Sequence, residues 1–245
     1  MTKQLTGKNA VITGGGTGIG FGIAVALAEL GCRVAITGRR AEKLAESIAT
    51  WQGEPGMLCH PVDVADRESV NTMFAWARQE LGQVDILVNS AGINIRDRSM
   101  AAMSPEEWDK VIAVNATGAY NCLHAVYSRM VERGDGLIVN ISSVAGKRAA
   151  AIAGVAYNAS KFAMTALGTS VANEAAEHGI RITNVYPGEV NTPILDNRPV
   201  QVSDEHKASI LQPSDIASLV AAIAVLPARA HVPEMVVKPL KQEYI

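Results

Sequence analysis

Aromatic residues are scarce in this sequence: Trp, Tyr and Phe together make up 4% of its 245 residues. Proteins that bind single-stranded nucleic acids stack the bases on aromatic side chains, and proteins that bind duplexes or anionic membranes carry an excess of positive charge. The formal net charge of this chain is −2. Its composition therefore gives no support to a nucleic-acid-binding or membrane-surface function.

Cysteine is also scarce. Cys32, Cys59 and Cys122 stand alone, without a CxxC pair or the spacing of a Cys/His metal site, so we expect neither a disulfide framework nor a bound metal. No apolar run reaches the roughly 18 residues of a membrane span, and residues 1–7 contain no apolar signal-peptide core. We therefore expect a soluble protein in the reducing cytoplasm.

Apolar residues are abundant, at 48% against 19% charged residues. They form short β-type runs that alternate with helical stretches, and the runs are continuously apolar, which is typical of strands covered on both faces. This pattern predicts an α/β fold with a doubly wound, parallel, seven-stranded sheet of the Rossmann type, in a single domain over residues 1–245. The expected strands are 9–12, 33–37, 57–61, 84–88, 137–141, 180–186 and 235–237, and the expected helices are 19–30, 41–51, 68–81, 104–130, 155–177 and one beginning at 213.

One long stretch, residues 187–211, fits neither pattern because it is rich in Pro, Asn and Asp. Long irregular segments in compact domains usually serve as lids or binding loops. We expect this segment to be an irregular loop that shapes a substrate pocket.

A glycine cluster lies between the first expected strand and its helix, with Gly14, Gly16, Gly18 and Gly20 around Thr17 and Ile19. Glycine permits tight turns and close approach of a pyrophosphate to the backbone, and a helix N-terminus offers N–H donors and positive dipole charge. A flexible turn is the alternative, but the strand-to-helix context favours a dinucleotide site.

The second expected strand ends in Thr37-Gly38-Arg39-Arg40. An acid at this position would bind the ribose 2′-hydroxyl of NAD, whereas arginine accommodates the 2′-phosphate of NADP. The pair Arg39 and Arg40 could also be a solvated charge pair at a helix start. We expect NADP(H) as the cofactor.

Tyr157 and Lys161 are four residues apart in an expected helix, so their side chains share one face. A neighbouring ammonium favours the phenolate and would lower the pKa of Tyr157 from about 10 toward values useful for proton transfer. A dinucleotide turn together with a tuned phenol predicts redox chemistry between a carbonyl and an alcohol.

Over nearly its full length the chain resembles the short-chain dehydrogenase/reductase family. The resemblance rests on motifs that occur in the family's order: Thr13-Gly14-x3-Gly18-Ile19-Gly20, Asp63 in Pro61-Val62-Asp63-Val64, Asn89-Ser90-Ala91-Gly92, Asn115 in Val114-Asn115-Ala116, Ser143, Tyr157-x3-Lys161 and Pro187-Gly188-x3-Thr192.

The resemblance implies a role for each matching position. Tyr157 would exchange the proton, Ser143 would hydrogen-bond the substrate carbonyl, and Lys161 would bind the nicotinamide ribose. Asn115 would hold a water molecule of a proton relay. The implied cofactor contacts beyond the glycine turn and the arginines are Asp63 and Val64 at the adenine, Asn89, Ala91 and Gly92 along the groove, and Val190 and Thr192, with Pro187 and Gly188, at the carboxamide.

Three departures from the family's pattern matter. Ser143 precedes Tyr157 by 14 residues, where 13 is commoner, the glycine turn carries no basic residue, and residues 226–235 lack the Asp-Gly-Gly ending of acyl-carrier reductases. This last stretch is similar to members that act on short 3-hydroxy acids. The substrate we expect is a carbonyl or secondary alcohol, with a small 3-hydroxy acid or a 3-oxoacyl compound as examples.

Alternatives remain at this stage. The chain could be a non-catalytic nucleotide-binding regulator of the same fold, or an epimerase or dehydratase, although those relatives are usually longer. Arg148 and His206 are weak candidates for holding a substrate carboxylate, and residues 96–98 are interpreted as a solvated loop that borders the substrate mouth. Small residues at Ala159, Ala163, Ala166 and Ala172 would let helices pack closely, and the resemblance implies a homotetramer or homodimer.

Overall fold

The computed structural model describes residues 3–243, and within them the seven strands form one parallel sheet. The strand order is β3-β2-β1-β4-β5-β6-β7, which winds outward in both directions from β1 and β4. This arrangement confirms the expected doubly wound Rossmann-type sheet. The strands are β1 (Asn9–Thr13), β2 (Arg33–Gly38), β3 (Leu58–Pro61), β4 (Ile86–Asn89), β5 (Gly136–Ile141), β6 (Ile180–Pro187) and β7 (Glu234–Val237).

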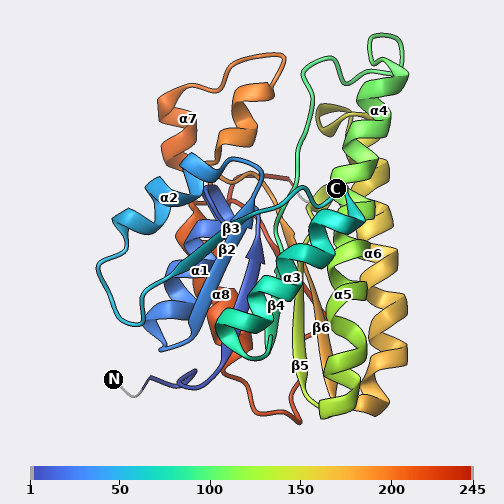
Figure 1. The fold of residues 1–245 in the computed structure, drawn as a ribbon. Coiled ribbons are helices and arrows are strands. Elements are labelled where there is room, and N and C mark those ends of the chain that lie inside the picture. Colours follow the sequence, from blue (N-terminus) through green and yellow to red (C-terminus); the bar gives the residue numbers. More distant parts are fainter. Residues whose placement is uncertain (1–2, 244–245) are drawn as a thin grey trace.

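Helices cover both faces of the sheet, as Figure 1 shows. One face is covered by α1 (Gly18–Glu29), α2 (Ala41–Thr50) and α8 (Pro213–Ala224), and the other by α3 (Arg67–Leu81), α5 (Gly118–Arg133) and α6 (Val155–Ala175). Each face has its own apolar core, because every central strand sends alternate side chains to opposite sides. No helix within residues 3–243 combines the length and apolarity that a membrane crossing requires.

A helix expected over residues 104–130 is interrupted. It begins as predicted, since Ser104 and Glu107 form a capping box around Pro105, but α4 (Pro105–Ile112) passes into a π-helical turn, η1 (Ala113–Thr117), before α5 begins. Such turns are rare and are frequent at functional sites. The turn contains Asn115, so that residue does not lie in regular α-helix.

The segment 187–211, expected to be irregular, has more order than its composition suggested. It contains the 3-10 turn η5 (Pro193–Asn197) and the short helix α7 (Asp204–Ser209), and a single bridge pairs Val190 with Leu211 at its ends. Its first part and α7 lie above the carboxyl ends of the strands, at the top of Figure 1. We call residues 188–211 the lid.

Candidate active site

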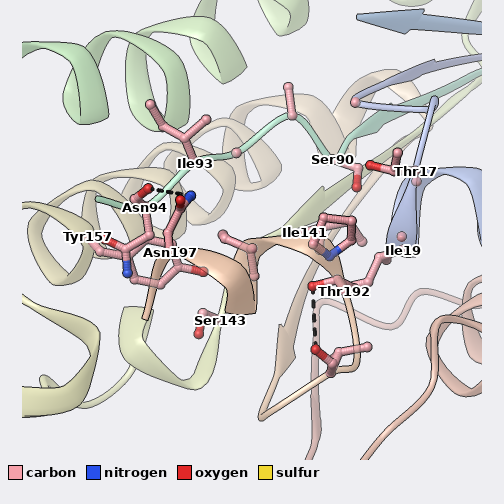
Figure 2. Close-up of a pocket in the computed structure, with 18 of the residues that line it drawn as sticks. Thr17, Ile19, Ser90, Ile93, Asn94, Ile141, Ser143, Tyr157, Thr192 and Asn197 are labelled. Atoms are coloured by element: carbon pink, nitrogen blue, oxygen red, sulfur yellow. Dashed lines mark hydrogen bonds between the residues drawn. The ribbon is translucent and has the colours of Figure 1, made fainter. Parts of the chain in front are cut away.

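A cleft of about 660 Å³ opens at the carboxyl ends of the strands, between the start of α1 and the lid. Ligands of open parallel sheets bind at this edge, where neighbouring connections diverge. The cleft residues that the sequence predicted are Gly14, Gly16, Thr17, Gly18, Ile19, Gly20, Arg39, Arg40, Asp63, Val64, Ala91, Gly92, Ser143, Tyr157, Lys161, Pro187, Gly188, Val190 and Thr192. In Figure 2, Thr17 and Ser90 lie toward one end and Tyr157, Ser143 and Asn94 toward the other.

Two predicted residues, Asn89 and Asn115, do not line the cleft. Asn89 is buried at the end of β4, where its Nδ2 donates to Asn140 Oδ1 at 3.0 Å, and Asn140 in turn donates to Asn184 Oδ1 at 3.0 Å. These amides link β4, β5 and β6 beneath the cleft. Contrary to the expectation that Asn89 lines the groove, it supports the sheet below.

The turn between β1 and α1 requires glycine at two positions. Gly14 has a φ of 64° and Gly18 a φ of 54°, a region that favours glycine. A Cβ added at Gly14 would lie 2.8 Å from the Ala91 backbone, and one at Gly18 would lie 3.0 Å from Thr192 Cγ2. The turn therefore packs closely on the segments that border the cleft, and it opens the N-terminus of α1 toward the cavity.

At the far end of the cleft, Arg39 and Arg40 follow β2 with exposed side chains. Within residues 3–243, no carboxylate lies within 4 Å of either guanidinium, whereas the neighbouring Lys43 pairs with Glu46 at 3.0 Å. Two uncompensated guanidinium groups at the end of the second strand can hold a phosphate by charge-assisted hydrogen bonds.

Ser143 lies just after β5 and begins a 3-10 turn. Its Oγ accepts a hydrogen bond from Ala145 N at 3.2 Å and donates weakly to Pro187 O at 3.5 Å. The preceding Ser142 points toward α6, where its Oγ donates to Lys161 O at 3.2 Å. The structure therefore supports Ser143 over Ser142 as the hydroxyl available to a substrate.

Lys161 is buried one helical turn after Tyr157. Its Nζ donates to Ile141 O at 2.8 Å and lies 5.5 Å from the centre of the Tyr157 ring. Burial lowers the pKa of Lys161 to about 8. Because its charge is disfavoured by burial, this ammonium can lose its proton close to neutral pH.

The surroundings of Tyr157 differ from the expectation. Burial raises the pKa of Tyr157, while a hydrogen bond with Ser143 and the positive charge of Arg98 lower it. The sequence pointed to Lys161 as the group that lowers this pKa, but in the structure Ser143 and Arg98 do so. Ionisation of the phenol near neutral pH therefore requires neighbouring groups that stabilise the phenolate against the effect of burial.

Asn115 is fully buried within η1, with both ends of its amide engaged. Its Nδ2 donates to Ile93 O at 2.9 Å and to Ser160 Oγ at 3.0 Å, and its Oδ1 accepts from Ile93 N at 2.8 Å. The side chain thus joins the π-turn to the loop after β4 and to α6. Through these bonds Asn115 fixes Ile93 and Ser160, which are the sequence neighbours of the cleft residues Gly92 and Lys161.

Gln242 is among the cleft residues that the sequence did not indicate, and Arg98 was indicated only in part. Residues 96–98 were expected to form a solvated loop that borders the substrate mouth; Arg98 lines the cleft, but it is only 8% exposed and donates to Ile152 O and Asn197 O. Gln242 reaches the cleft from the C-terminal segment and accepts a hydrogen bond from Glu189 N at 2.9 Å. Their partners lie between 53 and 99 residues away, so no local pattern signals these contacts.

Arg148 and His206, the two weak candidates for a substrate carboxylate, do not reach the cleft lining. His206 instead hydrogen-bonds Glu189 through Nε2 at 2.9 Å, and Glu189 also pairs with Arg198. Glu189 therefore joins the start of the lid to two points farther along it. Among residues 3–243, no three Asp, Glu, His or Cys side chains converge as a metal site requires.

Comparison with known proteins gives a consistent result. A family model described as short chain dehydrogenase matches residues 8–202. An uncharacterized oxidoreductase of Staphylococcus aureus (strain MW2) is 34% identical over 236 residues, which cover 96% of this chain and 99% of the relative.

Solved structures with similar folds include two ligand complexes. A serine dehydrogenase complexed with NADP+ aligns with a TM-score of 0.86 at 29% identity, over 96% of each chain. The 3-ketoacyl-(acyl-carrier-protein) reductase from Brucella melitensis, complexed with NADH, aligns with a TM-score of 0.86 at 28% identity, over 97% of this chain and 99% of that one. Sequence matches that cover most of both partners, on a shared fold, show that this chain belongs to the short-chain dehydrogenase/reductase family of oxidoreductases.

Proposed function

We propose that this chain transfers a hydride between NADP(H) and a carbonyl or secondary-alcohol substrate. The observation that carries the proposal is one continuous cleft, which joins the glycine turn before α1 to Ser143, Tyr157 and Lys161. A nucleotide lying along this cleft would have its phosphates at the α1 N-terminus, where N–H donors and the helix dipole favour negative charge.

The residues present fit such a cofactor. The close packing at Gly14 and Gly18 leaves the backbone of the turn bare, as approach of a pyrophosphate requires. The preference for NADP(H) over NAD(H) rests on Arg39 and Arg40, which have room and charge for a 2′-phosphate. Of the two complexes named above, one holds NADP+ and the other NADH, and both support a nicotinamide cofactor.

Each catalytic side chain has a distinct task in this proposal. The bound nicotinamide supplies or accepts the hydride. Ser143 donates a hydrogen bond to the substrate oxygen and orients it toward Tyr157. Tyr157 gives a proton to that oxygen during reduction and takes it back during oxidation. Lys161, with a pKa of about 8, binds the ribose and can restore the proton of Tyr157 at physiological pH.

For the substrate we propose a small 3-hydroxy acid or a 3-oxoacyl compound. The names of two similar structures, a serine dehydrogenase and a 3-ketoacyl-carrier reductase, support this class. The substrate end of the cleft also contains Arg98, whose charge no described carboxylate within 4 Å offsets, whereas Arg198 there is paired with Glu189. Positive charge there would favour a substrate with an acidic group.

A panel of aldehydes, ketones and 3-hydroxy acids, each assayed with NADPH or NADH and with NADP+ or NAD+, tests the proposal. We expect turnover of at least one class, with NADP(H) preferred over NAD(H), and strongly reduced turnover in the matched Tyr157→Phe variant. Cofactor binding without turnover of any compound would instead support the non-catalytic regulator.

We further propose that the chain assembles as a homotetramer or homodimer in the cytoplasm. The outer faces of α5 and α6 expose large apolar side chains: Tyr120 is 42% exposed, Phe162 43% and Val155 36%. Adjacent apolar residues on two neighbouring helices support association with a second copy of the same face.

A further inference from the structure

Arg98 occupies an unusual place in the loop after β4. Its side chain is 8% exposed and lines the substrate end of the cleft. One amino group (Nη1) donates to Ile152 O at 3.0 Å and the other (Nη2) to Asn197 O at 2.6 Å. The guanidinium therefore connects the segment before α6 with the lid.

This buried cation has no counter-ion. Within residues 3–243, no carboxylate lies within 4 Å of the guanidinium, and its Nε has no hydrogen-bond partner. Burial of an unpaired charge is costly. A neutral amide side chain could donate to backbone carbonyl groups without the cost of a buried charge, so structural bridging alone does not explain an arginine at this position.

The loop that carries Arg98 is attached to the helix that carries Tyr157. Val155 N, at the start of α6, donates to Arg98 O at 3.0 Å. A Cβ added at Gly154 would lie 2.4 Å from Arg98 Cβ, so the two segments are in direct contact. The guanidinium is thus held at a fixed place relative to Tyr157, two residues into α6.

The charged groups around Tyr157 come from several elements. Lys161 lies on α6, Glu189 follows β6, and Asp196 and Arg198 belong to the lid. Glu189 is paired with Arg198 and His206, and Asp196 is 4.0 Å from Lys207. Arg98 is the neighbouring arginine whose charge no described carboxylate offsets. Its positive charge lowers the pKa of Tyr157, against the effect of burial.

We propose that Arg98 is a positioning residue whose uncompensated charge stabilises the phenolate of Tyr157 and so sets the pH range of the reaction. The proposal rests on the hydride-transfer function proposed above. In oxidation, the phenolate would take the hydroxyl proton of the substrate, and a bound nicotinamide would accept the hydride. A nearby cation makes the phenolate available at lower pH, and the counter-ion that Arg98 lacks is then Tyr157 itself.

The pH profile of kcat/KM for alcohol oxidation tests this in three variants. An opposite charge lowers the pKa of an acidic group, by about one unit or more where the two groups are within roughly 6 Å. In Arg98→Gln we therefore expect the rising limb to move about one unit upward, with about tenfold lower kcat/KM on its acidic side. Arg98→Lys keeps the charge, so the rising limb of its kcat/KM profile is expected to stay at the wild-type pH. Arg96→Gln, an exposed arginine of the same loop, is the matched control and is expected to leave it unchanged.

A second measurement does not depend on turnover. Tyrosine labelled with ¹³C at Cζ reports ionisation by NMR, and the resonance of Tyr157 is the one that Tyr157→Phe removes. We expect its titration to begin at higher pH in Arg98→Gln than in the wild type or in Arg96→Gln. If that shift is seen but no carbonyl compound is turned over, the proposed function fails while the role of Arg98 stands.

Two results would overturn the proposal. Unchanged titration of Tyr157 in Arg98→Gln would reduce Arg98 to a bridge between the lid and α6. An equal shift in Arg98→Lys and Arg98→Gln would assign the effect to the lost hydrogen bonds and not to the charge. Where Arg98→Gln does not fold, Arg98→Lys keeps the proposal falsifiable, because a shifted Tyr157 titration in this charge-conserving variant would overturn it.

Discussion

Tyr157 and Lys161 are a pair of titratable residues whose charged forms are both disfavoured by burial. Burial raises the pKa of the phenol and lowers that of the ammonium to about 8. The protonated lysine is thereby made a readier proton donor, which is what restoring the proton of Tyr157 near neutral pH requires. The folded protein loses stability as a result, because Lys161 is buried in its charged form at pH values below its pKa.

That cost predicts an unusual stability effect for Lys161→Met. The unfolded lysine has a pKa near 10.5 and the folded one near 8. Below pH 8 both states are protonated and the folded state carries the full penalty, which disappears as the pH rises from 8 to 10.5. We expect the cofactor-free variant to be more stable than the wild type by about 1–2 kcal/mol at pH 7, after allowing for the lost hydrogen bond to Ile141.

Urea unfolding at pH 7 and at pH 10 measures this difference. The advantage of the variant should shrink at the higher pH because the wild-type lysine is then neutral in the folded state. A variant that is less stable than the wild type by the same amount at both pH values would contradict the burial penalty.

The proposed preference for NADP(H) also depends on single residues. Arg39→Ala removes one of two uncompensated guanidinium groups at the end of β2. Charge-assisted hydrogen bonds are worth about 1.5–3 kcal/mol, so we expect the Kd for NADPH to rise about 10- to 100-fold and the Kd for NADH to change little. Arg33→Ala, at the opposite end of the same strand, is the control. Equal weakening for both nucleotides would show that Arg39 does not hold the 2′-phosphate.

Among the elements, the start of α1 is closely constrained by packing. Gly20 lies in its first turn, where an added Cβ would approach Gly14 O to 2.4 Å. This contact locks the helix against the turn that faces the cleft. The helix N-terminus can therefore serve as a phosphate site only with glycine at this position.

Gly20→Ala should displace the turn or the helix. Overpacking of this kind costs about 1–3 kcal/mol in unfolding free energy, and we expect nucleotide binding to weaken by at least tenfold. Gly56→Ala is the matched control, because an added Cβ there meets nothing within 4 Å. Thermal unfolding and fluorescence titration with NADPH measure both effects. Similar behaviour of the two variants would contradict a packed phosphate turn.

Elements with strong local signals could be predicted from the sequence, and those decided by distant contacts could not. Three features follow from local patterns: the glycine turn, the Ser104 capping box and the shared helix face of Tyr157 and Lys161. The structure contains each of them at the predicted position. The π-turn at Asn115 was missed because its cause is a set of bonds to Ile93 and Ser160, 22 and 45 residues away.

The same reason accounts for Arg98 and Asn89. Arg96-Asp97-Arg98 reads as a polar loop, and only the approach of Ile152 and Asn197 buries its last residue. Asn89 matches a family motif next to the cleft, yet the neighbouring amides of β5 and β6 turn it into a link beneath the sheet edge. Sequence patterns place a residue on an element, but tertiary packing decides which way its side chain faces.

At the scale of the whole molecule, two apolar cores hold one sheet, and all the functional groups project from a single edge of it. This leaves the outer faces of the helices free for association. The helices that carry these exposed apolar residues, α5 and α6, lie on the opposite side of the sheet from α1 and α8 (Figure 1). Assembly through this side would not obstruct the glycine turn, which lies between β1 and α1.

Phe162→Glu should weaken assembly, because it introduces a charge into the centre of that face. We expect light scattering to report a dimer or tetramer for the wild type and a smaller species for the variant. Met100→Glu, on an exposed loop, serves as the control and should leave the mass unchanged. A wild-type monomer would contradict the proposed assembly and leave the catalytic account intact.

The central claim is that the Tyr157 hydroxyl carries the proton in a hydride transfer at this cleft. Its most direct test compares Tyr157→Phe with the wild type, with NADPH binding and turnover measured on the same preparations. The account predicts an NADPH Kd within about twofold of the wild type and a turnover reduced by at least roughly 10²–10⁴-fold, the usual contribution of a positioned general acid. Turnover within a few-fold of the wild type, with binding intact, would contradict it.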